Sequence, residues 1–178
     1  NRLWLKDKGH WAEFQDMMGN KLVHENAALW SIYTAIDSET GTPEQAWQAM
    51  RYVDRKIPHI PFTYQGQRYA TMSLSDWAPY EWSINNVAMA EVFHTSLAYF
   101  LAGRPETGTQ LLKSNMVDFM YAGSSPGNFG QLSTLDRNTG ESYRDFADVT
   151  GIGSRAFIQG LFGITPQALD GRCIIRPG

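Results

Sequence analysis

The chain has 178 residues, a formal net charge of −3 and a hydrophobic fraction of 43%. This length can bury one sizeable core, and no linker or shift of composition divides it, so we expect residues 1–178 to form a single domain. The mixed charges without a basic run argue against a nucleic-acid partner, and polar residues interrupt every apolar stretch before it reaches membrane-spanning length.

Two helices are predicted in the first third of the chain. Residues 22–36 are largely apolar, and Gly41 breaks the chain soon afterwards. A second helix then opens at Thr42-Pro43-Glu44-Gln45, because Thr42 can cap it, Pro43 suits the first helical position and Gln45 completes a capping box. The apolar residues of 43–57 recur at helical spacing and leave a polar face, so this helix is predicted to be amphipathic.

Three further helices are predicted before the end of the chain. Residues 84–102 are apolar on nearly all sides and stop at Gly103, so we expect this third helix to be buried. Residues 105–121 have an apolar and a polar face, and residues 152–162 are again mainly apolar. A short run, Cys173-Ile174-Ile175, has the composition of a β-strand.

The predicted helices alternate between apolar and amphipathic. An apolar helix needs neighbours on every side and an amphipathic one on a single side, so the alternation indicates inner helices wrapped by outer ones. The connections 37–41 and 103–104 are short, whereas 58–81 and 123–151 are long. We therefore expect an all-α fold, an α/α hairpin array with a short terminal strand, whose long loops gather at the amino ends of the inner helices and carry the function.

Acidic side chains on these loops are the candidate catalytic residues. Glycoside hydrolysis needs two carboxyl groups, because one protonates the leaving oxygen while the other activates water or attacks directly. For each acidic residue the alternative is a helix cap or a solvated charge. The best placed is Asp148, which lies just before the fifth helix at the end of the longest loop. The candidate carboxylates are Asp148, Glu81, Glu13 and Asp76.

Aromatic side chains have two expected roles. Those inside helices, such as Trp30, Trp47 and Phe93, are expected in the core. Those in the long loops, such as Tyr64 and Trp77, are candidate platforms for sugar rings.

Further polar and aromatic residues of the loops complete the candidate site. His24 opens the first helix and is a better candidate than His94, which we expect to be a hydrogen-bonded core histidine. We find no Cys/His cluster, phosphate-binding glycine loop or G-x-S-x-G motif in the sequence, and we expect neither a metal nor another cofactor. The candidate substrate contacts are His24, Trp82, Tyr80, Asn128, Tyr143 and Arg155.

Three short motifs lie where the inner helices are predicted to begin. They are Gly9-His10-Trp11-Ala12-Glu13-Phe14 followed by His24-Glu25-Asn26, then Glu81-Trp82-Ser83, and finally Asp148-Val149-Thr150-Gly151. In this order they resemble the G-x-x-x-E-[WF] turn, the G-W-S helix entry and the D-G-N-F-G loop of the six-hairpin glycosidases, the (α/α)6 toroid superfamily. The likeness is to inverting α-L-fucosidase-type enzymes or to an uncharacterised bacterial relative.

The resemblance implies more than the residues do by themselves. It implies that the chain is the C-terminal half of a larger toroid catalytic domain, with the N-terminal half of the parent chain as the partner that supplies the general acid. It also implies an oligo- or polysaccharide substrate, a water-activating role for Asp148, and a periplasmic or extracellular location.

The leading hypothesis is therefore that the chain is part of an inverting glycoside hydrolase, and two alternatives stay open. A polysaccharide lyase of the α/α toroid type would remove a proton beside a uronate carboxylate, for which Tyr143, Arg144, Asn128 and His59 are available. A non-catalytic carbohydrate-binding or scaffold domain would bind the same glycans without turnover.

Overall fold

The computed structural model describes residues 2–123, 133–139 and 149–176, and for Trp82, Ser83 and Arg137 it describes the backbone only. The helices in this part of the chain are α1 (Leu29–Asp37), α2 (Pro43–Lys56), α3 (Trp82–Asn85), α4 (Met89–Leu101), α5 (Pro105–Val117), α6 (Thr134–Thr139) and α7 (Val149–Arg155), with π-helical turns η1 (Asp118–Ala122) and η2 (Ala156–Leu161) and a 3₁₀ turn η3 (Ala168–Asp170). The strands are β1 (Trp4–Leu5), β2 (His10–Trp11), β3 (Phe14–Gln15), β4 (Val23–His24), β5 (His59–Tyr64), β6 (Gln67–Met72), β7 (Ile164–Gln167) and β8 (Arg172–Ile175).

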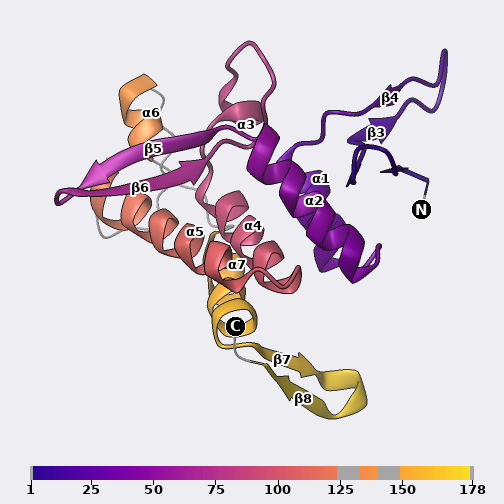
Figure 1. The fold of residues 1–178 in the computed structure, drawn as a ribbon. Helices are drawn as coiled ribbons and strands as arrows, with labels where there is room; N and C mark the ends of the chain where they lie inside the picture. Colours follow the sequence, from indigo (N-terminus) through magenta and orange to yellow (C-terminus); the bar gives the residue numbers. More distant parts are fainter. Residues whose placement is uncertain (1, 124–132, 140–148, 177–178) are drawn as a thin grey trace.

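The prediction of an all-α fold is wrong. The chain is about 50% helical and about 18% strand, and its described strands form four two-stranded antiparallel sheets (Figure 1). The largest sheet is the β5–β6 hairpin, which occupies much of the connection 58–81 that was expected to be irregular. Gln65 and Gly66 join its strands with φ of 48° and 76°, the left-handed pair that matches the twist of a two-residue hairpin turn.

The predicted helix boundaries were partly correct. Helix α2 begins as expected, since the Gln45 amide donates to Thr42 Oγ1 (3.2 Å) and the Thr42 amide donates to Gln45 Oε1 (2.9 Å). The first helix starts at Leu29 instead of residue 22, because residues 22–28 include β4 and an extended approach to the helix. The third prediction covers two helices, α3 and α4, which the extended backbone of Asn86 separates. The terminal strand is confirmed as β8, and β7 is its pairing partner.

Helix α4 is the centre of the fold. It contacts α1, α2, α5, α7 and η2 (Figure 1), and Phe93, Leu97 and Tyr99 are completely buried on it. This confirms that the third predicted helix is buried and that Phe93 belongs to the core. The same expectation for Trp47 is wrong: it is 43% exposed on α2, and the guanidinium of Arg51 lies 5.1 Å from its ring centroid.

Two hydrogen bonds show that α1 and α4 run in parallel. The Tyr33 hydroxyl donates to Glu91 Oε2 at 2.7 Å, and one turn further along each helix His94 Nε2 lies 3.0 Å from Asp37 Oδ2. At the amino ends of both helices, Leu74 accepts from the Leu29 amide (2.9 Å) and donates to the Asn86 carbonyl (2.8 Å). The segment 73–81 is therefore held where the two helices begin.

Candidate functional site

The candidate site is a cavity of about 480 Å³ at the amino end of α1. One wall is the β3–β4 hairpin, and the other is Trp77 on the segment 73–81. Trp77 Nε1 donates to the Asn26 carbonyl at 3.1 Å, so the backbone that leads into α1 fixes the position of this indole. The cavity is lined by Glu13, Phe14, Val23, His24, Glu25, Asn26 and Trp77.

Aromatic rings provide the two walls. Trp77 meets Trp30 edge to face, with ring centroids 5.6 Å apart and an interplanar angle of 89°. Across the cavity, Phe14 stacks on His24 with centroids 3.9 Å apart, and His24 Nε2 lies 3.1 Å from Asp16 Oδ1. Phe14 is 47% exposed although it is a large apolar side chain. Exposed rings that neighbours hold in place are suited to stacking on a flat, partly apolar ligand.

Glu13 has a structural role in this site. Its Oε2 accepts from the Ala28 amide (2.9 Å) and the Ser31 hydroxyl (2.7 Å), and its Oε1 accepts from Trp30 Nε1 (2.5 Å). Three donors occupy most of the acceptor positions of a carboxylate, and one of them is the backbone amide at the start of α1. The geometry therefore assigns Glu13 to capping α1 and orienting Trp30, which is the alternative that the sequence left open for each acidic residue.

Asp76 and Glu81 are exposed on the segment 73–81. Among the described residues, neither side-chain carboxylate has a hydrogen-bond or ion-pair partner. Burial raises the pKa of the Tyr52 hydroxyl to about 12, and the charges of Asp76 and Glu13 contribute smaller increases. Asp76 and Glu13 thus lie within electrostatic reach of the same buried hydroxyl, which donates to the Ala27 carbonyl (2.9 Å) just before α1. The fold brings Glu13, His24 and Asp76 to one region.

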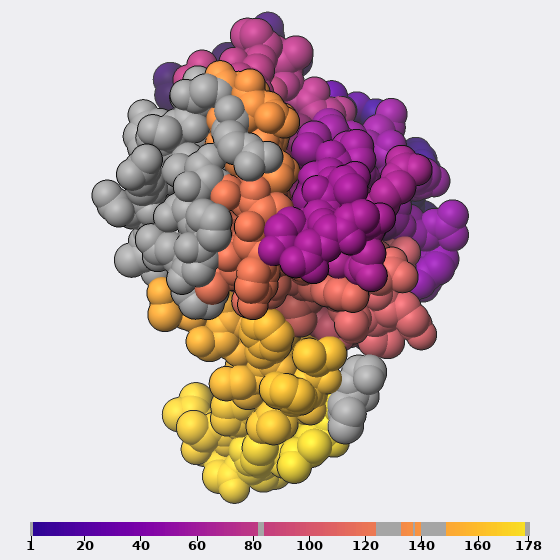
Figure 2. All heavy atoms as spheres, turned by 90° about the vertical axis from the view of Figure 1, so that its left-hand side faces the viewer, coloured from indigo at the N-terminus to yellow at the C-terminus, as the bar shows by residue number. Residues whose placement is uncertain are grey.

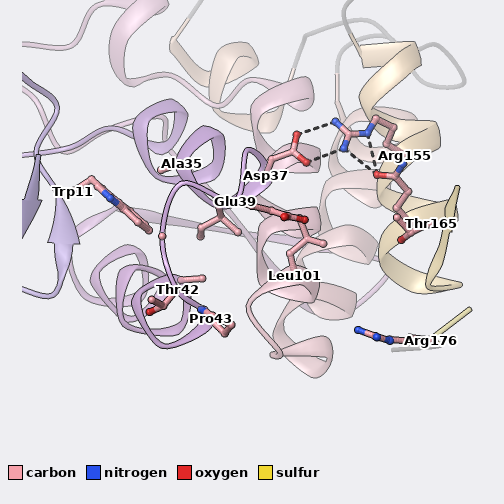
Figure 3. Close-up of a pocket in the computed structure, with 14 residues that line it drawn as sticks. Trp11, Ala35, Asp37, Glu39, Thr42, Pro43, Leu101, Arg155, Thr165 and Arg176 are labelled. Atoms are coloured by element: carbon pink, nitrogen blue, oxygen red, sulfur yellow. Dashed lines mark hydrogen bonds and ion pairs between the residues drawn. The ribbon is translucent and has the colours of Figure 1, made fainter. Parts of the chain in front are cut away.

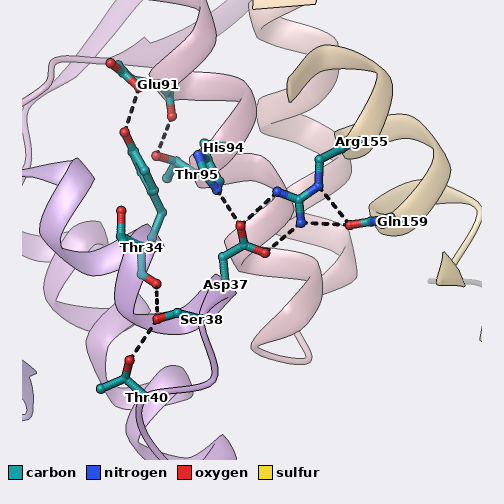
Figure 4. A network of polar contacts seen from close by, with 10 residues as sticks. Thr34, Asp37, Ser38, Thr40, Glu91, His94, Thr95, Arg155 and Gln159 are labelled. Carbon is teal, nitrogen blue, oxygen red and sulfur yellow. Dashed lines mark hydrogen bonds and ion pairs between the residues drawn. The ribbon is translucent and has the colours of Figure 1, made fainter. Parts of the chain in front are cut away.

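Arg155 lies at the opposite end of α1. Its Nη1 and Nη2 donate to the two oxygens of Asp37, the last residue of α1, at 2.9 and 2.8 Å (Figure 4). Asp37 also contacts His94, and Arg155 donates to Gln159 Oε1 (Figure 4). A cavity of about 560 Å³ beside this network is lined by residues that include Trp11, Glu39 and Arg176 (Figure 3). Arg155 is therefore not placed with His24 and Trp77.

The other sequence-predicted residues can be placed as follows. Tyr80 is exposed between Asp76 and Glu81 on the segment 73–81, and Trp82 begins α3. Asp148, Asn128 and Tyr143 lie outside the described residues, as does the side chain of Trp82. Sequence reasoning missed Phe14 and Asn26 as lining residues, because strands of two residues leave no periodicity to detect.

Asp37 makes a testable contribution to stability. Hydrogen bonds from Arg155 hold the pKa of the Asp37 carboxyl below its ordinary value in spite of burial, and His94 adds to this effect. A carboxyl whose pKa is lowered by folding stabilises the protein above its unfolded pKa, and this stabilisation is lost as the pH falls through the folded value. We expect Asp37→Asn to lower the free energy of unfolding by about 2 kcal/mol at pH 7, less than for a fully buried pair because Arg155 is partly exposed.

Urea denaturation at several pH values measures this effect. The difference between wild type and Asp37→Asn should begin to shrink below about pH 4, where the carboxyl of the unfolded chain becomes protonated, and should disappear once the folded carboxyl, whose pKa is lower, is protonated too. Asp170→Asn is the matched control, since Asp170 pairs with Arg172 on the exposed C-terminal turn and should change stability by less than about 0.5 kcal/mol. A loss that is the same at every pH would contradict the ion-pair explanation.

Three further observations bear on function. Among the described residues no group of three or more His, Cys, Asp or Glu side chains is arranged to hold a metal ion. None of the described helices combines the length and apolar character needed to cross a membrane. Comparisons of the chain with protein-family models, with curated proteins and with solved structures find no match.

Proposed function

We propose that this chain is a carbohydrate-active domain of a glycoside hydrolase, and that the cavity between the β3–β4 hairpin and Trp77 binds the glycan. The observation that carries the proposal is that oriented aromatic rings and acidic side chains meet at one open cavity. Sugar rings have apolar faces that stack on aromatic side chains, and their hydroxyls donate hydrogen bonds to carboxylates and can donate to or accept from amides. The motif likeness to the six-hairpin glycosidases begins at this cavity, with Glu13 and His24.

The catalytic carboxylates of this proposal come from different segments. Asp148 is the candidate base that activates water. Asp76 and Glu81, on the adjoining segment 73–81, are the remaining described candidates, because Glu13 is committed to capping α1.

The charges around the cavity favour hydrolysis or neutral-glycan binding over lyase chemistry. The described side chains there include more carboxylates than cations. The described residues that line the cavity carry two carboxylates, Glu13 and Glu25, and one imidazole, His24. Lys8 already pairs with Glu25, and His24 with Asp16. A uronate would meet net repulsion at this rim, whereas a neutral sugar would not.

Removing the Trp77 ring tests the binding site. We expect Trp77→Ala to weaken glycan binding by roughly thirtyfold, a loss of about 2 kcal/mol that is typical of a central aromatic contact. A neutral-glycan microarray identifies the strongest binder, and isothermal titration calorimetry then gives its dissociation constant for each variant. Trp47→Ala is the matched control, because Trp47 is an exposed tryptophan of α2 that does not line the cavity.

Each outcome bears on the proposal. Equal binding by wild type and Trp77→Ala, or no binding of any neutral glycan, would overturn it. The products formed by the full-length protein distinguish the classes: new reducing ends without unsaturated uronates indicate hydrolysis, and unsaturated uronates indicate a lyase. Saturable binding without products would select the non-catalytic binding domain.

A further inference from the structure

A second and larger cavity, of about 840 Å³, lies between the β5–β6 hairpin and α5. Figure 2 shows the magenta hairpin directly against α5 on this face of the molecule. The volume is within the range of pockets that hold small ligands. This groove is separate from the glycan cavity, since no described residue lines both.

The groove is lined by hairpin residues, five of which share one face; Gln67 and Tyr69 of β6 line it as well. The register pairs His59 with Met72 and Pro61 with Ala70, and Arg68 lies on the same face because side chains two residues apart in a strand point the same way. These residues line the groove together with the side of α5 that carries Thr107, Gln110, Leu111, Lys113 and Ser114. A ligand would therefore meet side chains from a β-hairpin and a helix.

The charge of the groove is opposite to that of the glycan cavity. Its cations are Arg68 and Lys113, and no Asp or Glu is among the described residues that line it. Neither cation forms an ion pair with a described carboxylate, and the ammonium of Lys113 lies 5.9 Å from the ring centroid of Tyr69. At the floor, Tyr99 donates to Asp54 at 2.7 Å, and that carboxylate is already paired with Arg104 (2.6 Å). Within the described part of the chain, the groove therefore keeps two positive charges that no carboxylate pairs with, although the net charge of the chain is −3.

The neighbouring polar groups suit hydroxyl-rich ligands. Gln110, Thr107 and Ser114 supply amide and hydroxyl groups along α5. His59 Nδ1 lies 3.0 Å from the Ile57 carbonyl and acts as the donor, which leaves Nε2 as the second polar atom of the ring. An acidic sugar carries both carboxylates and hydroxyls. Protein cations bind the carboxylates, and neighbouring amide and hydroxyl groups of the protein bind the hydroxyls.

We propose that this groove is a second binding site, which takes a uronate-bearing oligosaccharide. Arg68 and Lys113 bind its carboxylates, and the polar groups of α5 bind its hydroxyls. An acidic peptide fits less well, because its carboxylates would use Arg68 and Lys113 but it would not offer the many hydroxyls that the polar groups of α5 can bind. The proposal is independent of the function assigned to the glycan cavity.

Calorimetric titration with hexagalacturonate and with a mannuronate hexamer tests this site, with maltohexaose as the neutral probe. We expect at least one uronate hexamer to bind and maltohexaose not to bind in the groove. Arg68→Gln and Lys113→Gln should each weaken uronate binding by about tenfold, and binding should weaken between about 20 and 300 mM salt. Arg51→Gln is the matched control, since it removes the same charge from α2 outside the groove.

The remaining outcomes separate the alternatives. Failure of both uronate hexamers to bind, or equal binding by wild type and the Arg68→Gln/Lys113→Gln double variant, would overturn the proposal. Tighter binding of a poly-glutamate peptide than of either hexamer would assign the groove to acidic peptides and contradict it. Trp77→Ala should leave uronate binding unchanged, so failure at the glycan cavity and failure at the groove are distinguishable.

Discussion

Replacing Asp148 by Asn is expected, on the proposed function, to lower the rate of glycan hydrolysis by about 10²–10⁴-fold, the usual contribution of a general base. An amide has nearly the shape of a carboxylate but cannot accept the proton from water, so glycan binding should change little. Asp148 directly precedes α7, whose first residue, Val149, is completely buried. Turnover is measured as reducing ends released from the glycan that the array identifies.

The control for this prediction is Asp170→Asn, the same chemical change on the exposed turn between β7 and β8. It should leave turnover at the wild-type rate. Thermal unfolding of both variants checks that lost turnover does not reflect lost folding. Wild-type turnover by Asp148→Asn would remove Asp148 from the mechanism and leave Asp76 and Glu81 as the carboxylates to test next.

Phe93→Ala is expected to lower the free energy of unfolding by about 3–5 kcal/mol, the range found when a buried aromatic ring leaves a cavity. Phe93 is completely buried at the middle of α4. Its ring lies close to α7, where a Cβ built on Gly153 would be 3.4 Å from it, and its centroid is 6.4 Å from that of Phe157. The ring therefore joins the central helix to α7 and η2, and the loss should affect the packing of all three.

Urea denaturation at pH 7 measures this effect. Phe162→Ala is the matched control. Because Phe162 is 55% exposed, this substitution should lower the free energy of unfolding by less than about 0.5 kcal/mol. A loss below about 1 kcal/mol for Phe93→Ala would show that α4 and α7 can repack around the missing ring, which contradicts a tightly packed centre.

The sequence predicts the structural role of a residue where its contacts are with close neighbours in the chain or where its helix is strongly apolar. The capping box of Thr42 and Gln45 involves residues three apart, and the burial of Phe93 follows from a helix that is apolar on nearly all sides. The β5–β6 hairpin was missed although its Gln65-Gly66 turn carries a recognisable glycine, because the connection was interpreted from its length alone. That error, together with the missed strands β1 to β4 and β7, produced the wrong fold class.

The candidate site could be predicted only in part. Placing functional residues at the amino ends of helices led to Glu13, His24 and Asp76, which the fold brings to one region. The same rule could not show that Glu13 is occupied by three donors, since these come from residues 15, 17 and 18 positions away. It also could not separate Arg155 from the site, because its partner Asp37 is 118 residues distant.

By itself the sequence determined the extent of α2, the burial of α4 and the terminal strand, since backbone preferences, capping and hydrophobic periodicity act over a few residues. The tertiary structure alone decided which charges meet: Glu13 at the start of α1, Asp37 with Arg155, and Arg68 and Lys113 without a described carboxylate. The physical reason is that the position of a charged side chain depends on how distant segments pack, and the same residue can cap a helix, close an ion pair or face a ligand.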